Sequence, residues 1–170
     1  DPVQRHLVWQ TSSIDALLDG AYEGDLTIGE LAEHGDLGIG TVQHLDGEMV
    51  VVDGECFTIR ADGSVQRESS STRTPFAVVC RFSPDPPMPL TGPMDLAGLT
   101  ARIDEVAGTG APVVAVRVDG ILRDVHVRSV PRQHRPYPPL AEVTAHQVEW
   151  TVPEIRGSII GFRFPDYAQG

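Results

Sequence analysis

The chain has 170 residues, 41% of them hydrophobic, which is enough to bury the core of one compact domain or two small ones. Twenty-four acidic residues against thirteen basic ones give a net charge of −11, which argues against nucleic acid as a partner because phosphate binding needs a basic surface. Every basic residue is arginine, and the absence of lysine excludes Schiff-base chemistry for this segment.

Two short helices are predicted at the start of the chain. Ser13 is placed to N-cap a helix that ends at Gly20. Thr27 and Glu30 have the spacing of a capping box, and Gly35 is the predicted end of the second helix.

A meander of antiparallel strands is predicted from Leu37 onward. Asp-Gly pairs at positions 46–47, 53–54 and 62–63 separate short runs rich in Val, Ile, Phe and Thr. Asp-Gly tolerates the positive φ angles of tight hairpin turns, which favours this arrangement. With a further strand over residues 75–82, we expect residues 1–82 to form N-terminal helices plus a β-meander.

A proline-rich linker over residues 83–93 precedes a second unit, residues 94–170. Leu96, Leu99, Ile103 and Val106 have helical spacing within the predicted helix Asp95–Ala107. Two strands, a fourth hairpin turn at Asp119-Gly120, one or two helical turns over 140–147 and a last strand at 157–165 are predicted to follow. The expected fold class is α+β, with mainly antiparallel or mixed β-sheets and a few short helices.

The strand that leads to Val130 alternates apolar and polar residues. Val125 and Val127 lie on one face, and Asp124, His126 and Arg128 on the other. Arg128 is therefore predicted to point away from the valines.

An arginine-rich, proline-rich segment follows this strand. Arg128, Arg132 and Arg135 near rigid prolines would suit an anionic ligand, because a guanidinium matches a carboxylate. The alternative is that these arginines are solvated or paired with some of the acidic residues. No pair among the six histidines has the two- or four-residue spacing that directs two imidazoles at one metal ion, so ordinary structural roles are expected for them.

No membrane span and no secretory leader are predicted. The longest apolar runs, Met49–Val52 and Ala111–Val116, are far shorter than the roughly 20 residues that cross a bilayer. The first residues lack the order of a signal peptide, so we expect a cytoplasmic protein, although a leader removed earlier would leave the same pattern. Cys56 and Cys80 form no CxxC pair and are expected to be buried thiols.

Several ordered blocks resemble the α-acetolactate decarboxylase family, whose metal-dependent members convert 2-acetolactate to acetoin and carbon dioxide. The resemblance extends over nearly the whole chain, and ordered blocks are more specific than one short motif. The blocks are SSIDALLDGAYEGDLTIGELAEHGDLGIGTVQHLDGE, FTIRADG, TPFA, VRVDG, VRSVPRQHRPYPPLAEV and RGSIIGFRFPDYAQG.

The resemblance implies site residues for this chain. The family's active-site glutamate corresponds to Glu48 and its active-site arginine to Arg128, while Thr41 and Leu45 correspond to pocket-lining, substrate-binding positions. The family's zinc-binding histidines and a further glutamate come after the last matching block, so we expect the metal ligands to lie beyond Gly170.

The implied reaction is a metal-assisted decarboxylation of a small 2-hydroxy-3-keto acid through an enediolate, with zinc and no organic cofactor, in a homodimer. Two alternatives stay open. The first is an inactive, truncated form of that enzyme. The second is a non-enzymatic β-rich module that binds carboxylates.

Overall fold

The computed structural model describes residues 7–108, 110 and 112–165. The helices in this part are α1 (Ile14–Leu18), α2 (Ile28–Ala32), the 3-10 turn η2 (Gln43–Leu45), α3 (Leu96–Ala107) and α4 (Leu140–Thr144). The strands are β1 (Val8–Thr11), β2 (Leu26–Thr27), β3 (Leu37–Thr41), β4 (Glu48–Val52), β5 (Glu55–Ile59), β6 (Val65–Arg67), β7 (Arg73–Thr74), β8 (Phe76–Cys80), β9 (Val114–Ser129) and β10 (Val148–Arg163). Antiparallel sheets with a few short helices confirm the predicted fold class.

Six strands form the larger sheet, in the order β1-β8-β3-β4-β5-β6, and each neighbouring pair is antiparallel. The turn between β4 and β5 has φ angles of 52° at Asp53 and 77° at Gly54, the two positive values that a tight hairpin requires. The predicted meander is confirmed from β3 to β6. β8 then returns and inserts between β1 and β3, while β2 and β7 pair separately.

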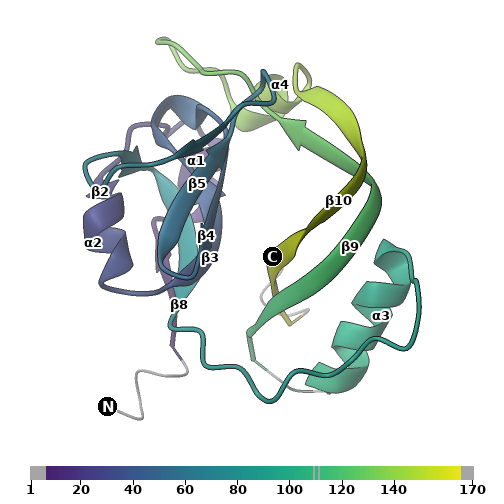
Figure 1. The fold of residues 1–170 in the computed structure, drawn as a ribbon. Helices are drawn as coiled ribbons and strands as arrows, with labels where there is room; N and C mark the ends of the chain where they lie inside the picture. Colours follow the sequence, from purple (N-terminus) through teal and green to yellow (C-terminus); the bar gives the residue numbers. More distant parts are fainter. Residues whose placement is uncertain (1–6, 109, 111, 166–170) are drawn as a thin grey trace.

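β9 and β10 form a second antiparallel unit, which Figure 1 shows as a long curved ribbon beside the larger sheet. The predicted hairpin turn at Asp119-Gly120 is wrong, because β9 continues through both residues and Gly120 lies opposite Gly157 of β10. Neither Asp119 nor Gly120 has the positive φ of such a turn. β10 begins at Val148 and pairs along almost all of β9, and this long ladder outweighs the local turn preference of Asp-Gly.

The predicted helix starts are confirmed by side-chain caps. Thr27 and Glu30 form a complete capping box at α2. The Ser13 side chain accepts a hydrogen bond from the Ala16 amide at α1, and Asp95 caps α3. None of the helices in the described ranges is long and apolar enough to cross a membrane.

The segment 83–93 contains no helix or strand and leads from β8 to α3. In Figure 1, α3 lies on the side of the ribbon that faces away from the larger sheet. The division of the chain into residues 1–82 and 94–170 stays a prediction, because side chains from both parts share one cluster of the core.

Buried apolar side chains form two clusters. The first packs α2 on the larger sheet and contains Ile28, Leu31, Val42, Met49, Val51, Cys56, Ala77 and Val79. The second joins the N-terminal part to the segment after β9 and contains Leu17, Tyr22, Leu45, Val130 and Val143. This second cluster holds the end of β9 against the loop between β3 and β4.

Both cysteines are free and buried, as predicted. Burial raises the pKa of the Cys56 thiol to about 12 and that of Cys80 to about 11. Both thiols therefore stay protonated and unreactive near neutral pH.

Candidate functional site

Glu48 is the first residue of β4 and lies opposite Thr41 of β3 and Ile59 of β5. Gly47 before it has φ 115°, and a Cβ at that position would lie 2.6 Å from the Ile59 carbonyl oxygen. Thr41 Oγ1 donates a hydrogen bond to the Gly47 carbonyl oxygen at 2.9 Å. The turn before Glu48 therefore has little freedom, and the position of the glutamate is defined by its neighbours.

Arg128 lies one residue before the end of β9, opposite Glu149 of β10. Half-buried and exposed side chains alternate over residues 125–128, with Arg128 exposed, which confirms the predicted alternation. Among the residues that the structure describes, the Arg128 side chain has no hydrogen-bond or ion-pair partner. Its guanidinium is therefore available to an anion.

The strand of Arg128 meets the sheet of Glu48 at Ser129. The buried Ser129 hydroxyl donates to the Ile59 carbonyl oxygen at 3.1 Å, and Ile59 is the strand partner of Glu48. Partial burial raises the pKa of the Glu48 carboxyl group, and the charge of Arg128 acts in the opposite direction. Glu48 is nevertheless an exposed residue, so its side chain lies at an accessible surface rather than in the core.

Thr41 and Leu45 are both buried, with 8% and 2% of their surface exposed. Thr41 supports the turn before Glu48, and its carbonyl oxygen accepts a hydrogen bond from Thr74 Oγ1 at 2.7 Å. Leu45 packs in the second core cluster. The structure thus gives both residues a supporting role beside Glu48, and their predicted contact with substrate stays a prediction.

Of the three arginines that could bind an anion, Arg128, Arg132 and Arg135, the last two are paired with acidic residues. Arg132 Nη1 lies 3.3 Å from Asp46 Oδ2, and Arg135 Nη2 lies 2.8 Å from Glu23 Oε1. For this pair the alternative of ion pairing is confirmed. Arg128 is the arginine that remains for a ligand.

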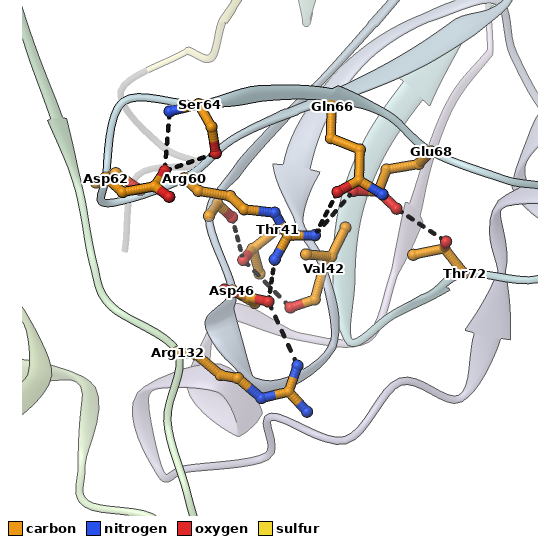
Figure 2. A network of polar contacts seen from close by, with 12 residues as sticks. Thr41, Val42, Asp46, Arg60, Asp62, Ser64, Gln66, Glu68, Thr72 and Arg132 are labelled. Atoms are coloured by element: carbon orange, nitrogen blue, oxygen red, sulfur yellow. Dashed lines mark hydrogen bonds and ion pairs between the residues drawn. The ribbon is translucent and has the colours of Figure 1, made fainter.

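Asp46 is shared by two arginines from different segments. Figure 2 shows Arg60 and Arg132 approaching its carboxylate from two sides. Arg60 also lies 3.4 Å from Glu68, whose carboxylate is buried. This network borders a cavity of about 450 Å³, whose wall also includes His44. The two predicted catalytic residues do not line this cavity, so the network holds the loop before Glu48 rather than adding to the site.

A second polar network was not predicted from the sequence. Tyr137 donates to Glu23 Oε1 at 2.7 Å, and its oxygen lies 2.7 Å from His44 Nδ1. Glu23 also accepts from Arg135 Nε at 2.9 Å and from Gln43 Nε2 at 3.0 Å. The hydrogen bond from Tyr137, followed by that from Arg135, lowers the pKa of Glu23 to about 2. No local pattern could have revealed this network, because it joins residues far apart in the sequence.

The described residues contain no group of three or more His, Cys, Asp or Glu side chains that could hold a metal ion. Two of the histidines in this part of the chain have other partners. His34 stacks on Trp9 with ring centroids 4.0 Å apart, and His126 Nε2 lies 2.9 Å from Glu149. These residues do not fit a zinc site.

Comparison with known proteins supports the resemblance seen in the sequence. The sequence model of the alpha-acetolactate decarboxylase family matches residues 8–170. The alpha-acetolactate decarboxylase of Methylococcus capsulatus is 44% identical over 165 residues, which are 97% of this chain and 64% of that protein. The chain therefore spans slightly less than two thirds of this relative's length.

Solved structures show the same fold. The crystal structure of alpha-acetolactate decarboxylase from Bacillus subtilis strain 168 superposes with a TM-score of 0.91 at 34% identity, covering 96% of this chain and 70% of that one. A Staphylococcus aureus protein, described as of unknown function and similar to alpha-acetolactate decarboxylase, superposes with a TM-score of 0.90 at 30% identity, covering 95% of this chain and 69% of that one.

Proposed function

Because the chain belongs to the alpha-acetolactate decarboxylase family, we propose that it carries the substrate-side residues of an enzyme that converts 2-acetolactate to acetoin and carbon dioxide. The observation that carries this proposal is the unpaired guanidinium of Arg128, whose charge acts on the carboxyl group of Glu48. The guanidinium can bind a carboxylate substrate, and the carboxyl group can supply the proton that the product takes up.

Arg128 binds the substrate carboxylate in this proposal. A guanidinium can donate two parallel hydrogen bonds to a carboxylate, which orients the substrate as well as attracting it. Arg128 lies near the end of β9, and the next residue, Ser129, is hydrogen-bonded to the larger sheet. The backbone of Arg128 is therefore well fixed. A fixed donor reduces the ordering cost of binding.

Glu48 holds or relays a proton in this proposal. Loss of carbon dioxide from 2-acetolactate leaves an electron pair as an enediolate, and one carbon must be protonated to give acetoin. Partial burial of the carboxyl group raises the pKa of Glu48, so this group keeps a proton to higher pH than an ordinary glutamate does. A raised pKa suits a carboxyl group to general acid–base work.

Zinc enters this proposal only as the cofactor that the family resemblance implies, to act as an electrophile. The described residues do not assemble a ligand set for it, and the roles of Arg128 and Glu48 do not depend on it. We also propose a cytoplasmic homodimer that uses no organic cofactor, and size-exclusion chromatography with light scattering tests its assembly.

The test is a decarboxylation assay of the purified chain with 2-acetolactate, with and without added zinc. We expect acetoin and carbon dioxide to form faster than in protein-free buffer. Arg128→Gln should lower the rate by about 100-fold, a typical loss when a substrate is misplaced. Arg123→Gln is the matched control, because Arg123 is exposed on the same strand and paired with Glu154, and it should retain the rate.

Absence of turnover in every condition would contradict the proposed function for this chain. Calorimetric titration with an unreactive 2-hydroxy acid then distinguishes the alternatives. Binding that depends on Arg128 would support a carboxylate-binding module, and absence of binding would support an inactive form of the enzyme.

A further inference from the structure

The segment after β9 lies along the loop between β3 and β4, the loop that leads to Glu48. The backbone N–H of Gln133 donates to the His44 carbonyl oxygen at 2.8 Å. On the other side of the loop, the His44 N–H donates to the Tyr22 carbonyl oxygen at 2.8 Å. The backbone of His44 is therefore held between the segment after β9 and the segment after α1.

This loop has an unusual backbone. His44 and Leu45 have φ angles of 66° and 53°, and Gly47 has φ 115°. The left-handed region is unfavourable for residues with a Cβ, so such a conformation persists only where surrounding contacts hold it. Because Glu48 follows directly, any relaxation of the loop would move its carboxyl group.

The side chains around Tyr137 form an ordered chain of hydrogen bonds. A tyrosine hydroxyl has one proton, and the Glu23 carboxylate can only accept, so Tyr137 donates to Glu23 at 2.7 Å. His44 must then donate from Nδ1 to the Tyr137 oxygen, 2.7 Å away. Arg135 and Gln43 complete the shell of donors around Glu23. Tyr137 therefore connects the strained loop to an anchored carboxylate.

We propose that Tyr137 is a positioning residue that, by bridging His44 and Glu23, holds the loop between β3 and β4 in the conformation that places Glu48 near Arg128. Tyr137 suits this role because it lies nine residues after Arg128 in a segment continuous with β9. The proposal rests on the proposed function, since the spacing of Glu48 and Arg128 matters only if both act on one substrate.

The test measures the electrostatic coupling of Glu48 and Arg128 without using turnover. NMR titration of the chain labelled with ¹³C at glutamate carboxyl groups gives the pKa of Glu48, whose signal is assigned with Glu48→Gln. With Tyr137 intact, Arg128→Met should raise this pKa, because a positive charge that acts on Glu48 is lost. In a Tyr137→Phe background, the same substitution should raise it by less than half as much.

Tyr22→Phe is the matched control. The Tyr22 hydroxyl donates to the Pro138 carbonyl oxygen at 2.6 Å, so its loss removes one tyrosine hydrogen bond to the segment after β9 and leaves the chain of hydrogen bonds to His44 in place. The effect of Arg128→Met should be unchanged in this background. If Tyr137→Phe does not fold, Glu23→Gln replaces it, because that change removes the anchoring charge and keeps the tyrosine.

Equal effects of Arg128→Met in the unmodified and Tyr137→Phe chains would overturn the proposal. An equal loss of coupling in Tyr22→Phe would also overturn it, because general loosening of the segment would then explain the loss. The proposal would fail as well if Arg128→Met had no effect on the pKa of Glu48. If the pKa of Glu48 responds to these substitutions as expected but the chain does not decarboxylate 2-acetolactate, the proposed function is contradicted and the role of Tyr137 is not.

Discussion

The hydroxyl group of Ser129 donates a hydrogen bond to the carbonyl oxygen of Ile59 at 3.1 Å and so joins the long ribbon to the larger sheet. Ser129 follows Arg128 in the chain, and Ile59 pairs with Glu48 across the strands β4 and β5. This single contact therefore lies between the neighbours of the two residues to which we assign the chemistry. It ties the backbone beside the arginine to the backbone beside the glutamate.

Ser129→Ala should destabilise the protein by about 1–2 kcal/mol. Ser129 is 1% exposed, so the substitution removes a buried hydrogen bond and leaves the Ile59 carbonyl without this donor. Urea denaturation followed by circular dichroism measures the change. The control is Ser158→Ala, because the Ser158 hydroxyl bonds an exposed carboxylate of Asp119 and should contribute less than about 0.5 kcal/mol. Equal costs for both substitutions would contradict the role of Ser129.

Arg128→Gln should change stability by no more than about 0.5 kcal/mol, because the side chain is exposed and makes no hydrogen bond or ion pair with described residues. Arg60→Gln is the contrasting variant, since it removes the arginine beside the buried Glu68 carboxylate and one of the two arginines that pair with Asp46. We expect a loss of about 1–3 kcal/mol for it. Thermal unfolding of both variants measures these changes. A large loss of stability in Arg128→Gln would contradict the view that Arg128 serves binding rather than folding.

Gly47→Ala and Gly120→Ala should differ strongly in stability. Gly47 has φ 115°, and a Cβ there meets the Ile59 carbonyl oxygen at 2.6 Å, so we expect a loss of about 2 kcal/mol or more. Gly120 has an ordinary strand conformation with no atom within 4 Å of an added Cβ, so alanine should be neutral or stabilise by a few tenths of a kcal/mol. Chemical denaturation of the two variants side by side measures both values. A costly Gly120→Ala would indicate that the residue turns after all.

Glu23 should make stability depend on acid pH. Its pKa is lowered from 4.5 to about 2 by the hydrogen bonds from Tyr137 and Arg135, so its contribution is complete above pH 4.5 and is lost as the pH falls towards 2. The free energy of unfolding of the unmodified chain should therefore fall more steeply over this range than that of Glu23→Gln. Asp85→Asn, an exposed linker residue, serves as the control and should leave the slope unchanged. Parallel curves for the unmodified chain and Glu23→Gln would show that Glu23 is not held as described.

Local sequence patterns predicted the parts of this fold that depend on nearby residues. Ser13, Thr27 and Asp95 start helices because a side-chain oxygen a few residues away can satisfy the free backbone amides. Asp53-Gly54 turns because both residues accept positive φ. Asp119-Gly120 has the same local preference and does not turn, because a partner strand that begins at Val148 pairs through it.

The sequence by itself determined the antiparallel class of the fold, the exposed side of Arg128 on its strand, and, through ordered blocks, the family. These follow from the period of a strand, the tolerance of Asp-Gly for tight turns and the order of motifs along the chain. Only the tertiary structure decided that Arg132 and Arg135 are paired with acidic residues, and that the charge of Arg128 acts on the Glu48 carboxyl group. It also revealed Tyr137 between His44 and Glu23, because contacts across such distances in sequence form only when the ribbon docks on the sheet.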